Sequence, residues 1–251
     1  MKLAMVYLAA VLATTGVAGA DDPAAVETVV DPKPFALDFS AEVDYYNFDE
    51  SLVVVTPTVG FTLFEVLDAT VALPVYNNTT ETGIGNLDFG AEYSIFQNKT
   101  GLLWADSSTL SVNGEVGVPL DGAFASDSLT FTLGGAFGLN WGNVGFEQTV
   151  SYLFDTGGEV YVPTFGGFID DSVLNADSSL TLTVSDSFSV GAEFSQNYAG
   201  DSKWLSVGPT VDWKVCSAFT LDVGVAFPVV QEDMPYGDND FTVSAGLGFQ
   251  F

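Results

Sequence analysis

The chain has 251 residues, of which 47% are hydrophobic, and it carries 33 acidic residues against 5 basic ones and no histidine. A disordered acidic protein would be poor in aromatic residues, and a soluble globular domain rarely combines 21 phenylalanines with a net charge of −28. The charge opposes nucleic-acid binding, and the lack of histidine removes the usual base for a serine or cysteine nucleophile. We therefore expect neither an enzyme nor a nucleic-acid-binding protein, but a protein whose surface is partly solvated by something other than water.

Residues 1–20 have the pattern of a cleaved signal peptide. Lys2 gives a positive start, residues 3–12 form an apolar run, and residues 17–20 end in a small-residue cleavage pattern. The run is too short to cross a membrane as a helix. Residues 21–34 are polar and rich in proline, and they are predicted to be a periplasmic lead-in to the domain that follows.

Residues 35–251 are predicted to form one all-β domain, a closed antiparallel transmembrane β-barrel of about twelve strands. Apolar residues alternate with small or polar ones over segments of about ten residues or slightly more, which is the period and length of a membrane-crossing strand. A bilayer accepts only helices and closed barrels, because every backbone polar group must be paired within the protein. The predicted strands are residues 35–48, 51–63, 66–76, 87–96, 108–120, 128–141, 143–154, 173–184, 187–198, 203–215, 218–230 and 240–251.

The connections between these strands tend to alternate between short and long, as they do in outer-membrane barrels, where periplasmic turns are short and external loops are longer. The even number of strands predicts that both termini lie in the periplasm. Short connections fall at residues 63–66, 141–143, 185–187 and 216–218, and longer ones at residues 77–86, 121–127, 155–172 and 231–239.

The last predicted strand ends in an alternating aromatic pattern. Phe249 and Phe251 share one face, and a terminal aromatic residue in this position resembles the signal read by the outer-membrane barrel assembly machinery. A soluble sandwich is the alternative, but it would need a second sheet to cover the aromatic face. We therefore expect export to the outer membrane of a Gram-negative-type bacterium, with membrane lipid and the assembly machinery as partners.

The segment from Gly83 to Phe96, GIGNLDFGAEYSIF, follows a strand end at residues 73–75. It resembles the outer-membrane barrel family of the MetA pathway of phenol degradation, in which a Gly-x-Gly-Asp loop precedes a strand with a glycine and a Lys-Tyr pair. Asn86 replaces the aspartate here, and Glu92 replaces the lysine. The resemblance implies a porin-like transporter, with hydrophobic substrates as one option, and it assigns no binding residue.

Strand parity predicts which charged residues face the lumen. Lys214 is the only inward base, and it is predicted to balance a neighbouring acid locally. In a hydrated lumen, a wall of carboxylates raises the local cation concentration and repels anions. The inward acids are Asp38, Glu42, Asp44, Asp68, Asp88, Glu92, Glu115, Glu147, Glu193, Asp212 and Asp222.

These residues predict a porin-like channel with a cation-preferring lumen for passive diffusion of small solutes. Many inward glycines favour open space, although twelve strands fall between side-chain-filled and open barrels. One alternative is a transporter of small hydrophobic or aromatic compounds, and another is a non-conducting structural or adhesive barrel. The only inward residues that suggest an apolar pocket are Tyr46, Val54, Tyr76 and Phe96. The sequence leaves the oligomeric state open, a homo-oligomer included.

The external loops carry two further expectations. They are acidic, so we expect divalent cations to bridge them loosely to lipid headgroups. We expect no cofactor and no specific metal site. The longest loop, residues 155–172, is unusually apolar for an exposed segment. We expect it to fold into or over the barrel mouth through Tyr161, Phe165 and Phe168; the alternative is that residues 159–165 extend a hairpin beyond the membrane.

Overall fold

The computed structural model describes residues 35–48, 51–63, 66–97, 100–170, 172–234 and 238–250. The predicted signal peptide, the predicted lead-in and Phe251 lie outside the described residues. Within these ranges, no helix has both the length and the apolar character needed to span a bilayer.

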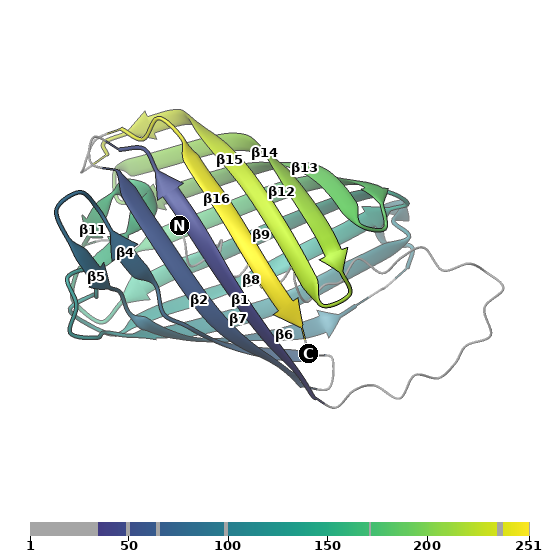
Figure 1. Cartoon of the computed structure of the whole chain (residues 1–251), viewed down its shortest axis with the longest axis horizontal. Helices are drawn as coiled ribbons and strands as arrows, with labels where there is room; N and C mark the ends of the chain where they lie inside the picture. Colours follow the sequence, from purple (N-terminus) through teal and green to yellow (C-terminus); the bar gives the residue numbers. More distant parts are fainter. Residues whose placement is uncertain are drawn as a thin grey trace.

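The described residues form twelve strand segments that cross an antiparallel barrel, as predicted (Figure 1). Consecutive segments are neighbours, and β1 pairs with both β2 and β16, so the sheet closes on itself. Closure leaves no unpaired strand edge, which is the condition for a β-sheet in a bilayer. The strands are β1 (Phe35–Tyr46), β2 (Leu52–Leu63), β3 (Leu67–Ala72) continued by β4 (Val75–Asn77), β6 (Leu87–Phe96), β7 (Ser107–Val118), β8 (Thr130–Trp141), β9 (Val144–Asp155), β12 (Val173–Ser185), β13 (Phe188–Ala199), β14 (Ser202–Cys216), β15 (Phe219–Glu232) and β16 (Thr242–Gln250).

Five short elements lie in the connections. A short strand pairs with β4 near one end of the barrel, and a 3-10 turn lies between β6 and β7. The loop between β9 and β12 folds into its own two-stranded sheet, with a 3-10 turn between its strands. These elements are β5 (Thr82–Ile84), η1 (Leu102–Trp104), β10 (Val160–Val162), η2 (Pro163–Phe165) and β11 (Gly167–Ile169).

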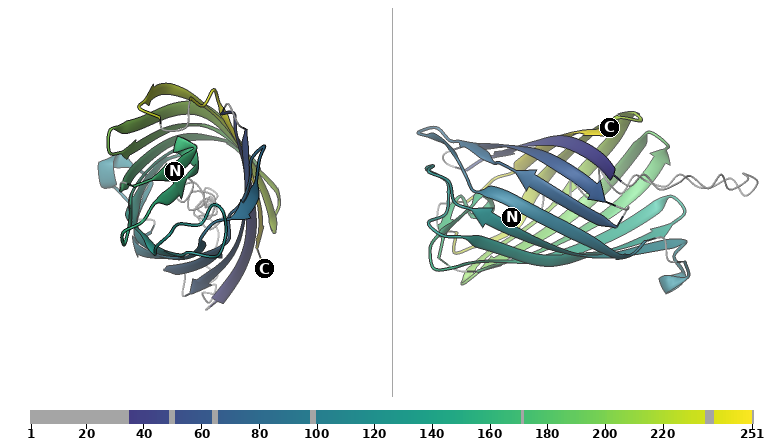
Figure 2. Two further views of the ribbon diagram at one scale, coloured as in Figure 1. Left: turned by 90° about the vertical axis from the view of Figure 1, so that its left-hand side faces the viewer. Right: turned by 90° about the horizontal axis from the view of Figure 1, so that it is seen from below.

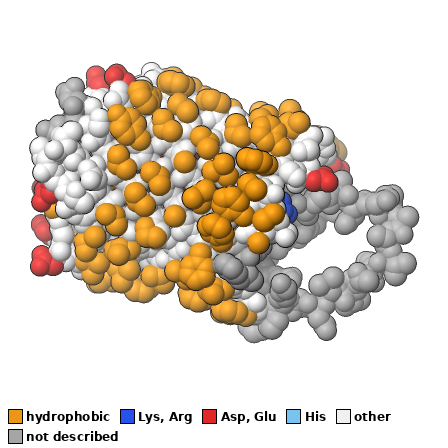
Figure 3. Space-filling model, viewed as in Figure 1, with side chains coloured by type: hydrophobic (Ala, Val, Ile, Leu, Met, Phe, Trp, Pro, Cys, Tyr) orange, Lys and Arg blue, Asp and Glu red, His pale blue; other side chains and the backbone are white. Residues whose placement is uncertain are grey.

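Alternating side chains give the barrel two different faces. On β1, Glu42, Asp44 and Tyr46 are buried, whereas Phe39 and Val43, which have the opposite parity, are exposed on the outside. The wall seen in Figure 3 is covered by hydrophobic side chains, and acidic side chains appear toward its two ends. This distribution is the one expected of a wall in contact with lipid.

Aromatic rings pair on the outer face close to the strand ends. The ring centroids of Phe35 and Phe61 are 6.1 Å apart, and those of Phe219 and Phe249 are 4.9 Å apart. These pairs lie toward the barrel end that holds the first residues of β1 and the last residues of β16, since Asp38 pairs with Gln250. The tight turns lie at the same end of the barrel. That this end faces the periplasm remains a prediction.

Two prolines, Pro57 and Pro209, lie inside strands without a register shift at either position. The register of β2 against β1 is unbroken through Pro57, which pairs with Ala41. On the other side of Pro57, the neighbouring strand is interrupted between β3 and β4. The register of β14 against β15 is likewise the same before and after Pro209, although the residues between are unpaired. A missing N–H removes a ladder bond without requiring an extra residue, so the strands keep their alignment.

Candidate functional site

The inner wall of the barrel contains the predicted lumen acids. Each lies on the strand face opposite the exposed aromatic face, as the cross-strand pairs require. Their burial differs with position, and the half-buried members include Glu147 and Asp222. The fully buried members are Glu42, Asp44, Asp88, Glu92 and Glu115.

Asp177 on β12 is an inward acid that sequence reasoning missed. Its side chain is only 4% exposed, and it pairs across the sheet with Thr149 on β9 and Ser195 on β13. The signal was present in the sequence, because Val173, Asn175 and Asp177 alternate with residues that face outward. Asp177 therefore belongs to the same acidic wall.

Several of the acids are direct cross-strand neighbours. Asp68 on β3 pairs with Glu92 on β6, and Asp212 on β14 pairs with Asp222 on β15. Like charges directly opposite each other in a sheet are destabilising when nothing screens them. The arrangement concentrates negative potential at particular places on the wall, which favours cations at those places.

Lysine contributes little to the described inner wall. Lys214 lies at the end of β14, opposite Thr220, and its side chain is exposed. The other lysine in the described residues, Lys203, pairs with Tyr198 on the lipid-facing side of its strand. Deeper positions of the described wall therefore carry acids without an inward base beside them.

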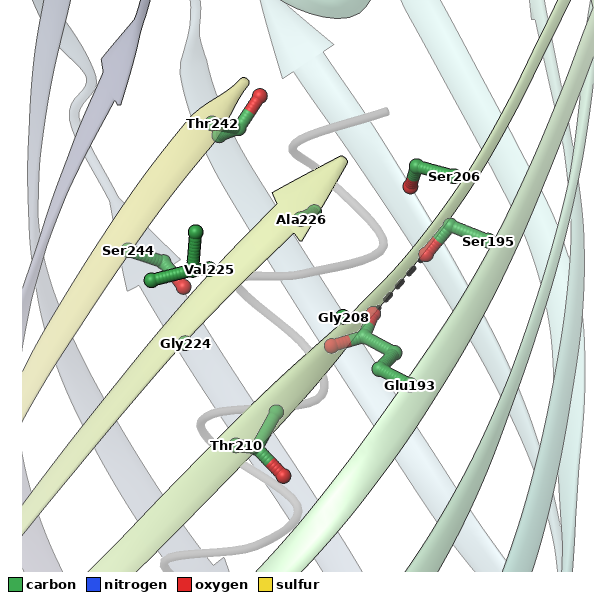
Figure 4. Close-up of a pocket in the computed structure, with 10 residues that line it drawn as sticks. All are labelled: Glu193, Ser195, Ser206, Gly208, Thr210, Gly224, Val225, Ala226, Thr242 and Ser244. Atoms are coloured by element: carbon green, nitrogen blue, oxygen red, sulfur yellow. Dashed lines mark hydrogen bonds between the residues drawn. The ribbon is translucent and has the colours of Figure 1, made fainter. Parts of the chain in front are cut away.

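A small depression lies on the wall formed by β13, β14, β15 and β16 (Figure 4). Its charged member is Glu193, whose Oε1 accepts a hydrogen bond of 3.0 Å from the Ser195 hydroxyl. The remaining lining residues are small or carry hydroxyl groups. They are Ser206, Gly208, Thr210, Gly224, Val225, Ala226, Thr242 and Ser244.

The loop of residues 155–172 packs at the barrel end opposite the tight turns. Its strands β10 and β11 pair with each other and do not extend β9 and β12 outward, so the hairpin-extension alternative is wrong. Figure 2 shows this small hairpin inside the ring of strands. Phe165 is fully buried in a cluster on the inner wall. That cluster consists of Leu153, Val160, Val162, Phe165, Ile169, Val173, Ala199 and Trp204.

Tyr161 connects this loop to the other side of the barrel. Its ring centroid lies 5.1 Å from that of Tyr76, 4.9 Å from that of Phe124 and 5.2 Å from that of Phe168. Tyr161 packs against a second buried cluster on the β1, β2 and β4 side, which faces β9 and β12 across the ring in strand order. This cluster consists of Tyr46, Phe48, Leu52, Val54, Tyr76 and Phe124. The loop therefore reaches across the mouth.

No protein-family model matches the chain, and no curated protein matches it. Among solved structures, an outer membrane channel from Pseudomonas putida F1 is similar, with a TM-score of 0.67 at 10% identity, over 92% of this chain and all of that one. The NanC porin has a TM-score of 0.61 at 10% identity, over 85% of this chain and all of the porin. The KdgM porin has a TM-score of 0.54 at 9% identity, over 84% of this chain and 99% of the porin.

The fold defines the class of the protein as an outer-membrane β-barrel. All three similar structures are outer-membrane channels or porins, and the location of this chain in the outer membrane of a Gram-negative-type bacterium is the one predicted from its sequence. At this level of identity the likeness concerns the fold alone. The resemblance to the MetA-pathway family has no further support from these comparisons and remains a prediction.

Proposed function

We propose that the protein is a porin-like channel whose lumen prefers cations and passes small solutes by diffusion. The observation that carries this proposal is the unequal charge of the described inner wall, where inward acids lie on nine of the twelve strands and Lys214 lies at one end. Carboxylates around a hydrated pore attract cations and exclude anions without a binding pocket for any one solute.

The loop of residues 155–172 sets the width of the mouth in this proposal. Tyr161 holds it to Tyr76 and Phe124 by ring contacts, and Phe165 fixes its base in the wall. Because Phe165 is buried and Tyr161 packs on the buried rings of Tyr76 and Phe124, the loop is a fixed constriction and not a freely moving lid. The size limit for solutes then depends on the space beside the aromatic rings.

A transporter of small hydrophobic or aromatic compounds is the second candidate. Three of the inward residues that suggested an apolar pocket in the sequence belong to a buried cluster at the mouth. They are Tyr46, Val54 and Tyr76. The rings of that cluster pack against one another, which supports a structural role for them. The KdgM porin has been seen in complex with oligogalacturonate, an anionic sugar chain. The acidic wall of this barrel disfavours such a polyanion.

We also propose that divalent cations loosely bridge the acidic external loops to anionic lipid headgroups. The acidic loop residues Asp170, Glu232, Asp233, Asp238 and Asp240 are exposed and accessible to ions. Removal of divalent cations from vesicles with anionic lipid should then lower the thermal stability of the barrel. Unchanged stability after chelation would count against this bridging.

Ion selectivity of the refolded mature protein in a planar bilayer tests the main proposal. Glu92→Gln and Glu115→Gln each remove one buried lumen charge and should lower the preference for K⁺ over Cl⁻. Asp186→Asn is the matched control, because Asp186 is exposed in a turn outside the lumen. Equal selectivity in all three variants and the wild type would contradict the assignment of selectivity to the wall, and a folded but silent barrel would favour the transporter or a structural role.

A further inference from the structure

The connection between β6 and β7 carries the most exposed large apolar side chain of the described residues. Trp104 is 91% exposed, and Leu103 beside it is exposed as well. Both belong to the 3-10 turn η1, which lies at the barrel end that holds the tight turns. A tryptophan ring has a large apolar area, so leaving it in water costs free energy. The turn therefore presents an apolar surface that the described part of the chain leaves uncovered.

The turn lies outside the barrel and beside its lipid-facing wall. The indole N–H of Trp141 donates a hydrogen bond of 3.3 Å to the carbonyl oxygen of Leu103. Trp141 is on the outer face of β8, because its parity is opposite to that of the buried, inward Thr132 on the same strand. Figure 2 shows the short turn outside the ring of strands. Its apolar side chains are therefore on the side of the membrane and not below the pore.

Two outward residues of the wall beside the turn are buried. Ser108 on β7 and Leu139 on β8 form a cross-strand pair on the outer face, and neither is accessible to solvent to any extent. Outward residues farther along the same two strands, Val112 and Leu133, are exposed. Leu139 is two residues from Trp141, to which the turn is bonded, so the turn is the element that covers this pair. The connection thus extends the apolar outer surface of the barrel sideways.

The backbone of the turn is held in a strained conformation. Leu103 and Trp104 have φ angles of 50° and 59°, in the left-handed region that is unfavourable for residues other than glycine. Hydrogen bonds next to the turn fix it to the β8–β9 connection: the Asp106 N–H donates to the Asn140 carbonyl oxygen at 2.8 Å, and Asp106 Oδ2 accepts from the Gly142 N–H at 2.6 Å. Strain that the surrounding structure maintains at an exposed site indicates a role for that site.

Lipid is the occupant that this position favours. The turn continues the wall that is in contact with lipid, and the outward ring pairs Phe35–Phe61 and Phe219–Phe249 lie toward the same end of the barrel. Such rings mark the level at which a barrel meets the lipid headgroups. Tryptophan is favoured at this level, because its ring can lie beside acyl chains while its N–H remains hydrated.

We propose that Leu103 and Trp104 form an interfacial anchor that inserts into the headgroup region of the leaflet at the tight-turn end of the barrel. The anchor lies on a connection outside the wall, so it holds the β6, β7 and β8 side of the barrel at a fixed depth in the bilayer. If the tight turns face the periplasm, this leaflet is the inner one. The inference goes beyond the proposed function, because it does not require the barrel to conduct.

Tryptophan quenching in phosphatidylcholine vesicles tests the anchor in the refolded mature protein. Trp141, Trp204 and Trp213 remain in Trp104→Ser, so the difference between wild type and this variant reports Trp104 alone. We expect lipid brominated near the headgroup end of its acyl chains to quench this difference signal about two-fold, and iodide in the water to quench it little. The tryptophan introduced by Asp186→Trp is the control, because residue 186 lies in an exposed turn. It should respond to iodide and not to brominated lipid.

Each other outcome of the quenching experiment overturns the anchor. Quenching of Trp104 by iodide alone would place it in water, where it would be available to a soluble partner. Shielding from both quenchers would mean that a second copy of the barrel covers it. Equal lipid quenching of the tryptophans at 104 and 186 would show that η1 is no different from another turn.

A nitroxide label gives a second measurement that keeps Trp104 in place. The label is attached to Leu103→Cys in a Cys216→Ser background, which removes the only native cysteine. We expect its collisions with oxygen, which concentrates in lipid, to exceed those with a water-soluble nickel chelate. The same label on Asp186→Cys should show the reverse order. A label at residue 103 that collides mainly with the nickel chelate would overturn the anchor, whatever the conductance of the barrel.

Discussion

Asp212 on β14 and Asp222 on β15 face each other directly across the barrel wall. The carboxylate of Asp222 leans over Gly246 and accepts a hydrogen bond from the Gly246 backbone N–H. Asp222 therefore has a donor on one side and a like charge on the other. The repulsion within such a pair destabilises the barrel wall, and the two charges together make the potential at this place in the lumen strongly negative.

Asp212→Asn should stabilise the barrel because it removes one of two facing charges. We expect the free energy of unfolding in urea to rise by about 0.5 kcal/mol at low salt, with a smaller gain at high salt. Urea titration of the protein in lipid vesicles measures the difference. Asp186→Asn in an exposed turn is the control and should have no effect, and a loss of stability in Asp212→Asn would contradict the repulsion.

Gly208→Ala should destabilise the barrel, because the new Cβ atom would collide with the Val225 carbonyl oxygen. Moving a backbone carbonyl costs about 1 to 3 kcal/mol. Gly114→Ala is the matched control, since the nearest atom to its added Cβ is Leu133 Cδ2 at an ordinary 3.5 Å. Unfolding free energies from the same urea titration should separate the two variants, and equal stability would show that the carbonyl can move freely.

Tyr161→Ala should widen the mouth and raise the single-channel conductance. The substitution removes a ring that contacts Tyr76, Phe124 and Phe168, so it frees the loop from the opposite wall. Tyr152→Ala removes an outward tyrosine that contacts Phe154, and it should leave conductance unchanged. Conductance that is the same in both variants and the wild type would mean that the loop does not limit the pore.

Cys216 reports the orientation of the barrel in the cell. It is exposed at the end of β14, beside one of the tight turns, and it is the only cysteine in the sequence. If the tight turns face the periplasm, a membrane-impermeant maleimide too large for the pore should label Cys216 only after the outer membrane is permeabilised. Labelling in intact cells would place this end outside and reverse the predicted topology.

The strands could be predicted because lipid on one side and water on the other impose an alternation that is visible in each segment. The predicted strand at residues 128–141 matches β8 to within two residues at its start. The hairpin of β10 and β11 could not be predicted, since three-residue strands carry no usable period. Its apolar residues gave the only signal, and they correctly indicated that this loop does not extend into solvent.

The candidate site was predictable in part. Parity identified Glu193 as an inward acid, and it would have identified Asp177 if applied to every residue of that strand. Pro209 marked an irregular place in its strand, but the position of the Val225 carbonyl depends on the register between β14 and β15. That register depends on contacts around the whole barrel, so it cannot be predicted from the sequence of either strand alone.

The reversal potential of the wild-type channel under a ten-fold KCl gradient tests the central claim most directly. A strongly cation-selective pore should reverse near the potassium equilibrium potential, which is about 59 mV for a single charge and a ten-fold gradient. A reversal potential near zero would contradict a selective acidic lumen, and a value of the opposite sign would mean that anions pass more easily than cations.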